Sequence, residues 1–403
     1  MSDHTYDVLI SGGGIAGLVA AVAFGSAGFS VICVDPAPPV TTMDQANADL
    51  RTTAFLQPSR AFLDQIGLWP AFAPHAAELA IMRIVDAGGT EGEARLIRDF
   101  DSADISDLPF GWNLPNWLLS RELLRQINDL ATVDFRAGTG TTTLFTRIGE
   151  ARVGLSDGSR IRCKLVIAAD GRASPMREAA GIDVKTTRFG QKALAFAVTH
   201  PIPHQNISTE IHRSGGPFTL VPLPDRDGMP CSAVVWMEDG PTAQDLAALE
   251  VAAFEEALNL RSCLLYGPLK LASRRTVWPI IAQHAQALTG QRLALVAEAA
   301  HVLPPIGAQG LNMSLADIAT LRELAIATPD QIGSADMLAK FEATRLPDIR
   351  LRIAGITALN RASMQGSQAF MDLRAAGLQT LYGIPGLRKS IMQLGLGLAS
   401  KPA

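Results

Sequence analysis

The chain has 403 residues, of which 48% are hydrophobic and 18% are charged, and its formal net charge is −4. A globular chain of this length can bury a large core, and two or three lobes are expected rather than one. The slightly acidic balance argues against a nucleic-acid-binding protein, because such a protein needs a basic face.

Four cysteines stand far apart, at positions 33, 163, 231 and 263, and none belongs to a CxxC pair. This spacing indicates neither a metal site nor a redox dithiol, and it is typical of a reducing cytosol. The polar start MSDHTYD predicts no signal peptide, and no apolar run has the roughly 18 residues of a membrane-spanning helix.

The stretch from Tyr6 to Asp35 has the order strand, glycine-rich turn, helix, strand. The apolar run Val8–Ile10 predicts a buried strand, and an Ala-rich helix is expected from about Ile15 to Ala27. A second apolar run, Ser30–Val34, predicts the next strand. This order is the βαβ unit of dinucleotide-binding domains.

Three glycines with GxGxxG spacing, Gly12, Gly14 and Gly17, lie between the first strand and the helix. The first allows the tight turn, the second lets the backbone approach a pyrophosphate, and the third lets the helix pack closely on the strand. Asp35, 18 residues after Gly17, is placed to accept hydrogen bonds from a ribose diol. The alternative is a glycine-rich turn in an ordinary α/β domain.

One arginine close after this unit is a candidate ligand of phosphate. Arg51 lies in the segment DLRTTAF, and from spacing alone it is equally a pyrophosphate clamp or a surface residue. Arg121 lies on a helix expected from about Trp117 to Leu130. Another helix is expected over Ser59–Ile66, and the alternating pattern of Leu79–Phe100 indicates short strands of a second lobe.

A later strand, expected over Arg160–Ala169, ends in Asp170-Gly171. An Asp-Gly pair at this position puts a carboxylate at the edge where open α/β sheets bind ligands. Taken alone, the pair is better explained as the turn that ends a strand.

The region Val184–Met237 is rich in β-formers and turns, and it predicts a mixed or antiparallel sheet that forms the substrate lobe. Phe218 and Trp236 are candidates for packing against a substrate, although both residue types are commonly part of a core. One amphipathic helix is expected over Asp245–Leu260, and a strand over Leu269–Ile280.

The strand predicted over Arg292–Ala297 is followed by a glycine-rich loop from Glu298 to Asn312, and then by a helix from Met313 to about Ala327. This order of strand, carboxylate, loop and helix N-terminus again predicts a site that binds an anion. His301 in this loop is a possible base or ligand. No second histidine stands at ligand spacing, so a structural histidine that caps its own turn is the other interpretation.

The rest of the chain is expected to be helical, over Leu338–Asn360 and in a tail over Ala375–Ser400. The tail carries apolar residues at helical spacing, namely Leu387, Ile391, Leu394 and Leu398. This stripe is consistent with core or dimer packing, and also with a helix that lies on a membrane surface.

Three sites follow one another along the chain: the glycine turn with Asp35, the pair Asp170-Gly171, and the segment from Glu298 to Asn312. In this order they resemble the FAD-dependent aromatic hydroxylases of the p-hydroxybenzoate hydroxylase fold, and the resemblance covers nearly all of the chain. Within them the chain is most similar to the ubiquinone-biosynthesis hydroxylases. The segments that carry this closer resemblance are DLRTTAFLQPSRAFLDQIGLW, FEATRLPDIR, ITALNR and LRAAGLQTLYGIPGLRKSIM.

The resemblance implies an α/β fold with a Rossmann-like FAD-binding domain, an inserted β-sheet substrate domain and a C-terminal helical region. The FAD-binding domain is expected to comprise residues 1–75, 110–182 and 276–345. The substrate domain is expected to comprise residues 76–109 and 183–275, and the helical region residues 346–403.

The resemblance also implies roles for individual residues. Asp35 would bind the ribose, Arg51 and Arg121 would lie near the pyrophosphate and ribityl chain, and Glu298 would bind ribityl hydroxyls. Asp170 and Gly171 would serve both FAD and the nicotinamide reductant. The ADP moiety would lie on Gly12, Gly14, Ile15, Ala16 and Gly17. The isoalloxazine ring would lie against Pro305, Gly307, Ala308, Gln309, Gly310, Leu311 and Asn312. Pro305 is the candidate nearest to both flavin and substrate, and the helix N-terminus would stabilise reduced flavin.

The chain departs from the family pattern twice. Ala297-Glu298 replaces the usual Gly-Asp, and Gly307-Ala308 replaces the usual Ala-Gly before Gln309-Gly310. Alanine tolerates positive φ poorly, so Gly307 is expected to take over the unusual conformation from Ala308.

The activity implied is that of an FAD-dependent monooxygenase that hydroxylates a polyprenylated phenol of ubiquinone biosynthesis through a flavin C4a-hydroperoxide. It would consume O₂ and take electrons from NAD(P)H or another donor. No second GxGxxG unit is present, which argues against a reductase with two dinucleotide sites and favours transient binding of the nicotinamide or another electron donor. The alternatives are a hydroxylase of a small soluble aromatic and a non-catalytic flavin-binding scaffold. A cytoplasmic protein is expected, with peripheral membrane contact and a biosynthetic complex or homodimer as possible partners.

Overall fold

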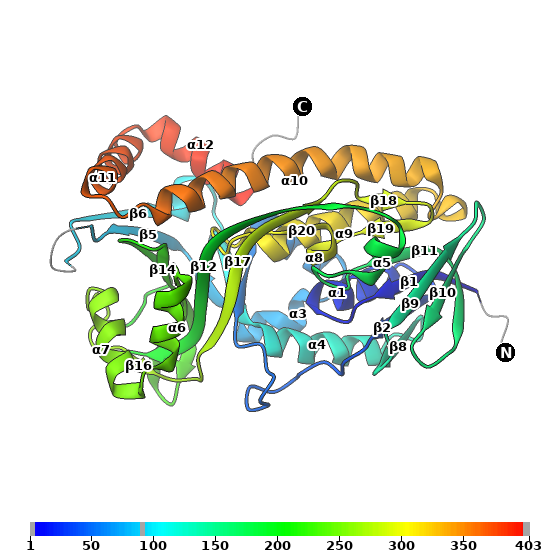
Figure 1. Ribbon diagram of the computed structural model, residues 1–403, viewed down its shortest axis with the longest axis horizontal. Helices are drawn as coiled ribbons and strands as arrows, with labels where there is room; N and C mark the ends of the chain where they lie inside the picture. Colours follow the sequence, from blue (N-terminus) through cyan, green and yellow to red (C-terminus); the bar gives the residue numbers. More distant parts are fainter. Residues whose placement is uncertain (1–4, 89–92, 398–403) are drawn as a thin grey trace.

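The computed structural model describes residues 5–88 and 93–397, and Leu398 of the predicted apolar stripe lies outside this range. Within it, two large sheets stand side by side, and a long helix crosses above both (Figure 1). The predicted fold class, a Rossmann-like α/β domain with an inserted β-sheet domain and C-terminal helices, is confirmed.

The first sheet is mostly parallel and has the central order β18-β19-β11-β1-β2-β8, with β10 and β9 continuing from β11. Its central strands are apolar and buried, as expected for a parallel sheet that is covered on both faces. The strands are β1 (Thr5–Ser11), β2 (Val31–Asp35), β8 (Val133–Ala137), β9 (Thr141–Thr146), β10 (Ala151–Leu155), β11 (Arg160–Ala168), β18 (Thr289–Gly290) and β19 (Leu293–Leu295).

The second sheet has the order β20-β17-β12-β15-β14-β13-β5-β6, with β16 beside β12. Most neighbours are antiparallel, while β13 and β5 are parallel. The strands are β5 (Ile81–Asp86), β6 (Leu96–Asp101), β12 (Val184–Thr199), β13 (Ile207–His212), β14 (Pro217–Arg226), β15 (Met229–Asp239), β16 (Lys270–Leu271), β17 (Thr276–Ala285) and β20 (His301–Val302). A small third sheet contains β3 (Thr52–Leu56), β7 (Gly111–Pro115) and β4 (Ala77–Leu79).

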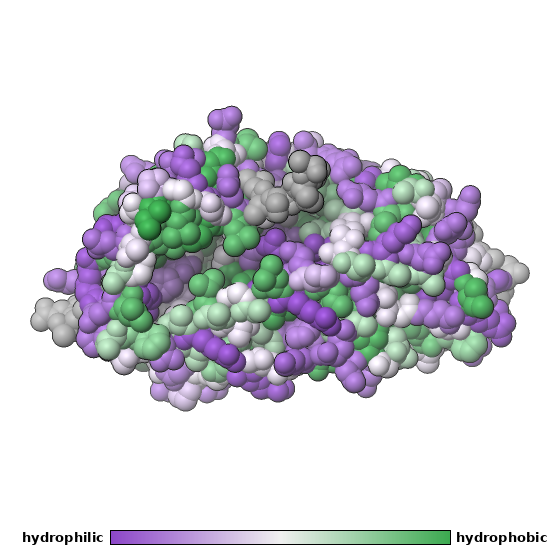
Figure 2. Space-filling model, turned by 90° about the horizontal axis from the view of Figure 1, so that it is seen from above, coloured by the Kyte–Doolittle hydropathy of each residue, from purple (hydrophilic) through white to green (hydrophobic). Residues whose placement is uncertain are grey.

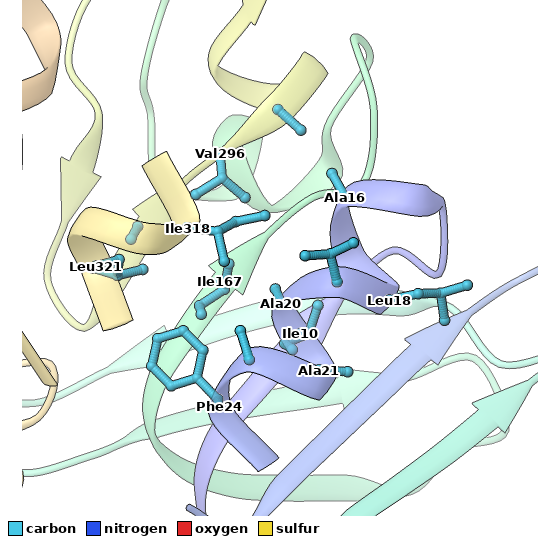
Figure 3. Packing of buried hydrophobic residues seen from close by; sticks show 14 of the residues in the cluster. Ile10, Ala16, Leu18, Ala20, Ala21, Phe24, Ile167, Val296, Ile318 and Leu321 are labelled. Atoms are coloured by element: carbon cyan, nitrogen blue, oxygen red, sulfur yellow. The ribbon is translucent and has the colours of Figure 1, made fainter. Parts of the chain in front are cut away.

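The core of the first domain forms where two helices pack on the parallel sheet. Helix α1 (Ile15–Gly25) lies between β1 and α9 (Gln309–Ala327), and Phe24, Ile318 and Leu321 meet there (Figure 3). The Arg322 Nε donates to the Ala23 carbonyl at 2.8 Å, which ties the two helices together. The other helices on this side are α2 (Gln57–Gln65), α3 (Trp69–Phe72), α4 (Asn116–Asn128), α5 (Pro175–Ala179) and α8 (Ala297–Ala300).

One predicted helix is two helices in the structure. The prediction of a single helix over Asp245–Leu260 was wrong, because α6 (Gly240–Ala248) and α7 (Val251–Arg261) are separated by extended backbone at Leu249 and Glu250. The break lets the buried side chains of both short helices, such as Phe254, pack into one core on the same face of the second sheet. The expected strand over Leu269–Ile280 is likewise divided into β16 and β17.

Helix α9 begins at Gln309, four residues before the predicted start at Met313. Residues 309–312 therefore form the first turn of a helix rather than a loop. The C-terminal region contains α10 (Ala335–Met364), α11 (Gln368–Gly383) and α12 (Pro385–Leu396). The predicted continuous tail helix is broken before Pro385, because proline favours extended backbone in the residue that precedes it.

Ion pairs hold α11 against the second sheet. Asp86 of β5 is 1% exposed, and its carboxylate binds Arg95 at 2.6 Å and Arg374 of α11 at 3.1 Å. Arg95 also binds Asp372 of α11 at 2.7 Å. Further along, Arg388 of α12 binds Asp104 at 2.9 Å. These pairs fix two helices that have few buried side chains of their own.

We expect Arg374→Met to loosen α11, because the buried Asp86 then keeps only one of its two arginines. A loss of roughly 1–3 kcal/mol in the free energy of unfolding is expected, with faster chymotrypsin cleavage within residues 365–397. Arg361→Met is the matched control, since Arg361 is exposed on α10. Equal cleavage rates for the two variants would contradict this role for Arg374.

Candidate active site

The glycine turn after β1 is closed so tightly that two of its positions have no space for a side chain. Gly12 has φ +104°, and a Cβ atom there would lie 2.3 Å from the Ala169 carbonyl oxygen. A Cβ on Gly17 would lie 1.9 Å from the Gly12 carbonyl oxygen. A Cβ on Gly14, in contrast, would have no heavy atom within 4 Å. The open side of the turn is therefore above Gly14.

The same turn presents an uncapped helix end. Gly14 is the N-cap of α1, no side chain caps it, and the first turn, which starts with Ile15 and Ala16, contains no acidic residue. Asp35 at the end of β2 accepts hydrogen bonds from the Gly13 amide at 2.6 Å and the Ala37 amide at 2.8 Å. Its carboxylate thus braces the glycine turn and keeps further acceptor capacity for a ligand.

Asp170 lies beside this turn, since a Cβ on Gly12 would be 2.9 Å from the Asp170 Cα. Its Oδ2 accepts from the Ser11 hydroxyl and the Met176 amide, both at 3.2 Å. Its Oδ1 is buried and has no partner among the described residues. Burial raises the pKa of the Asp170 carboxyl, against the hydrogen bonds that lower it. Gly171, at φ +84°, turns the chain away from the sheet.

Arg51 is held beside Glu298, which is exposed on α8. Its guanidinium forms a two-pronged pair with Asp49, at 2.8 and 2.7 Å, and lies 5.6 Å from the centre of the Trp278 ring. The hydrogen bonds that Arg51 donates to Asp49, and more weakly the charge of Glu298, raise the pKa of Arg51. The structure therefore brings together two residues that are far apart in the sequence.

Arg121 lies on α4 and bonds Glu122 at 2.7 Å, while its guanidinium lies over the Trp117 ring. Glu122 is 3% exposed and also binds Arg125 at 3.0 Å. The orientation of Arg121 is thus set by its own helix.

The segment from His301 to Gln309 leads into α9, and we call it the flavin-facing loop because the resemblance places the isoalloxazine ring there. Gly307 has φ +64° and Ala308 has φ +54°, so the expectation that Gly307 alone would take the left-handed conformation was wrong. Both residues adopt it, because the chain must reverse before α9 begins. Ala308 is the N-cap of α9 without a side-chain cap, and Pro305 and Gly310 are exposed.

Asn312 and Leu311 of the first turn of α9 face the protein. Asn312 accepts from the Leu56 amide at 2.9 Å and donates to the Ala54 carbonyl at 2.8 Å, and so joins α9 to β3. Leu311 packs against the core of the first domain.

His301 is buried, and its Nε2 lies 2.7 Å from the Asp317 carboxylate of α9. It is a structural histidine, but it bonds a helix rather than capping its own turn. No group of three or more His, Cys, Asp or Glu within residues 5–88 and 93–397 is arranged to hold a metal ion.

The second sheet turns an apolar face towards the flavin-facing loop. Ile306 of the loop packs there with Val235 and Met237 of β15 and with Trp278 of β17. Phe218 and Trp236 instead pack edge to face at 5.5 Å in the core under α6 and α7. The interpretation of Phe218 and Trp236 as core residues therefore agrees with where the structure places them. Because side chains alternate along a strand, the sequence predicted that β15 has two faces, but it did not indicate which face lies against the loop.

The residues of the glycine turn, Asp170 and the start of α9 fit an FAD molecule. One uncapped helix end and the open space above Gly14 suit the pyrophosphate, and a second uncapped end at Ala308 suits the electron-rich edge of a reduced ring. The unpartnered Asp170 oxygen offers a hydrogen-bond acceptor between them.

Gly14→Val is expected to reduce FAD occupancy of the purified protein at least tenfold, because the new side chain fills the space through which the pyrophosphate approaches. Its melting temperature without FAD should stay close to that of the wild type, since a Cβ at this position touches nothing. Gly17→Val is the comparison and should unfold the domain. Normal flavin absorbance of the purified Gly14→Val variant would show that the glycine turn is not part of the FAD site.

Asp170→Asn is expected to raise the melting temperature of the FAD-free protein at pH 7.5. The pKa of Asp170 is raised in the folded protein, so ionised Asp170 destabilises the folded protein at pH values above that pKa. This destabilisation disappears as the pH falls towards the ordinary pKa of an aspartate, near 4. The gain should therefore vanish near pH 4. Asp245→Asn, at an exposed carboxylate of α6, is the control, and an equal gain in both variants would contradict the assignment.

Comparison with known proteins agrees with this geometry. The family described as FAD binding domain matches residues 5–352. The chain is 31% identical to the ubiquinone hydroxylase UbiL of Rhodospirillum rubrum over 98% of this chain and 90% of the relative. It is 24% identical to the 3-demethoxyubiquinol 3-hydroxylase of Escherichia coli, over 99% of this chain and all of the relative.

Solved structures share the fold. The p-nitrophenol 4-monooxygenase PnpA of Pseudomonas putida superposes with a TM-score of 0.81 at 19% identity, and each chain is 99% covered. PqsL of P. aeruginosa superposes with a TM-score of 0.77 at 22% identity, over 92% of this chain and 99% of PqsL. The predicted resemblance is confirmed: the chain belongs to the FAD binding domain family and is an FAD-dependent monooxygenase of the group that includes the ubiquinone hydroxylases.

Proposed function

We propose that this monooxygenase hydroxylates the aromatic ring of a polyprenylated phenol in ubiquinone biosynthesis. The observation that carries the proposal is the apolar face formed by Val235, Met237 and Trp278 opposite Ile306 of the flavin-facing loop. A substrate between loop and sheet would meet hydrocarbon and an indole ring, which favour an aromatic ring with an apolar substituent. The similarity to ubiquinone hydroxylases supports the same substrate class.

The cofactor would be held by the glycine turn and by Asp35 at its ADP end. Arg51, Arg121 and Asp170 would contact the middle of the molecule, Glu298 the ribityl hydroxyls, and residues 305–312 the ring. Bound FAD supplies the redox and oxygen chemistry, with NAD(P)H or another donor as the source of electrons and O₂ as co-substrate. The side chains of this protein bind, orient and exclude water.

An amide pair beside the apolar face supports a substrate that carries a hydroxyl group. The Asn360 side chain of α10 is fully buried and donates to Gln191 Oε1 at 2.8 Å, while Gln191 donates to the Gly215 carbonyl. Asn360 Oδ1 is buried without a partner among the described residues. A buried acceptor of this kind is suited to a phenol O–H or to a water that bridges to it.

The C-terminal helices support delivery of an apolar substrate. Large apolar side chains of α11, of α12 and of the residue between them are 41–65% exposed. They are Phe370, Leu373, Ile384, Leu387, Ile391 and Leu394. Apolar patches are visible at this end of the molecule (Figure 2). Among the described residues, no helix is long and apolar enough to cross a membrane. We propose that α12, which also carries the exposed Lys389, rests on the surface of an anionic membrane.

The test is quinone profiling by mass spectrometry in the organism that carries this gene. Deletion should cause accumulation of a prenylated phenol that lacks one hydroxyl. The wild-type gene should clear it, and Gly14→Val should not. An unchanged quinone pool would overturn the proposal, and hydroxylation of water-soluble phenols by the purified flavoprotein would then identify a small-aromatic hydroxylase. Bound FAD without substrate-stimulated oxygen consumption would identify a non-catalytic scaffold.

A further inference from the structure

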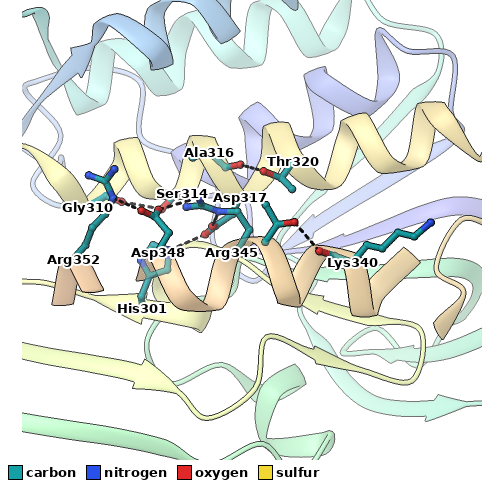
Figure 4. Close-up of polar contacts among 11 residues, drawn as sticks. His301, Gly310, Ser314, Ala316, Asp317, Thr320, Lys340, Arg345, Asp348 and Arg352 are labelled. Atoms are coloured by element: carbon teal, nitrogen blue, oxygen red, sulfur yellow. Dashed lines mark hydrogen bonds and ion pairs between the residues drawn. The ribbon is translucent and has the colours of Figure 1, made fainter. Parts of the chain in front are cut away.

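The flavin-facing loop is held at both ends by one continuous network of polar side chains. His301 stands at its first position and Gln309 at its last. From His301 the network runs along α9 and α10 to Arg352 (Figure 4), and Arg352 bonds Gln309. None of its members other than Gln309 belongs to the sites assigned above, so its effect on the reaction is indirect.

From Asp317 onwards the network alternates between acidic and basic side chains. His301 Nε2 lies 2.7 Å from Asp317 Oδ2, and Arg345 Nε donates to Asp317 Oδ1 at 2.7 Å. Arg345 Nη1 then donates to Asp348 Oδ2 at 3.0 Å, and Arg352 Nε donates to Asp348 Oδ1 at 3.0 Å. Asp317 is fully buried and Arg345 is 7% exposed, so removal of either partner would leave a buried charge uncompensated.

Arg352 sets the orientation of the Gln309 amide. Its Nη1 donates to Gln309 Oε1 at 2.7 Å, and because a guanidinium has no acceptor, the amide oxygen must face it. The amide nitrogen therefore points the other way. It donates to the Gly307 carbonyl of the loop at 2.9 Å and to the Gly395 carbonyl of α12 at 3.1 Å.

The bonds from Gln309 meet the loop where its backbone is least favourable. Gly307 and Ala308 are consecutive left-handed residues. For alanine this conformation costs about 1–2 kcal/mol, and it persists only where the surroundings enforce it. Here the Gln309 side chain holds the Gly307 carbonyl, and the start of α9 fixes Ala308 from the other side.

We propose that Arg352 is a positioning residue for the flavin-facing loop, and that through Gln309 it couples the loop to α12. This rests on the proposed use of the loop to hold the flavin ring. Arg352 is also adjacent to the end of α12, since a Cβ on Gly397 would lie 3.4 Å from its Nη2. Movement of α12 on a membrane or on binding substrate therefore changes the bonding of the residue that shapes the loop.

The test compares Arg352→Met with the wild type and with Arg350→Met, a control at an exposed arginine two residues away on the same helix. Arg352→Met is expected to weaken FAD binding about tenfold, to change the visible absorption of bound FAD and to make its reduction potential more negative. Hydrogen exchange in residues 385–397 of the FAD-free protein should become faster. Arg352→Lys should restore these properties in part, since an ammonium can still donate to Gln309.

Gln309→Glu is the second variant, for the case that Arg352→Met does not fold. It keeps the pairing with Arg352 but cannot donate to Gly307 and Gly395, and it should give the same changes in flavin absorption and in exchange of α12. Wild-type absorption, potential and exchange in the variants that fold would overturn the proposal. Failure of the wild-type protein to bind FAD would instead refute the assignment of the site itself.

Discussion

The site depends on how closely α1 approaches β1 and β11. With a Cβ position on Gly17 only 1.9 Å from the Gly12 carbonyl oxygen, any side chain there would push the helix away from the turn. The close approach aims the uncapped N-terminus of α1 at the open space above Gly14. It also places Asp170 beside the turn, because β11 is the neighbour of β1 in the sheet. The proposed pyrophosphate site would therefore depend on backbone geometry, with few side chains involved.

Helix α9 adds the second half of the cleft because it packs on α1. The contact through Phe24, Ile318 and Leu321, together with the bond from Arg322 to α1, fixes the direction of α9 relative to the glycine turn. Its N-terminus is thereby held at the end of the flavin-facing loop. Ala308 accepts an unfavourable conformation at this position, and Asn312 ties the same turn to β3. Rigid packing on one side thus supports strained backbone on the other.

The second domain forms one side of the candidate site, and the C-terminal helices lie above it. The same strand, β15, contributes Trp236 to the closed core under α6 and α7, and Val235 and Met237 to the face opposite Ile306. Helix α10 runs above both sheets and brings Asn360 and Arg352 to different parts of the cleft (Figure 1). Its length allows this one helix to contact both the second sheet, through Asn360 and Gln191, and the flavin-facing loop, through Arg352 and Gln309.

The sequence by itself determined the features that depend on local physics. Glycine spacing, the apolar runs and the carboxylates at strand ends predicted the βαβ unit and the α/β class, because turns and buried strands restrict residue types locally. Only the tertiary structure decided which residues from different elements of the chain meet. Arg51 beside Glu298, Ile306 against Trp278, and Gln309 between Arg352 and Gly395 are products of packing between elements. The break at Glu250 and the left-handed Ala308 have the same origin, since each local preference was overridden by a tertiary constraint that leaves no signal in the nearby sequence.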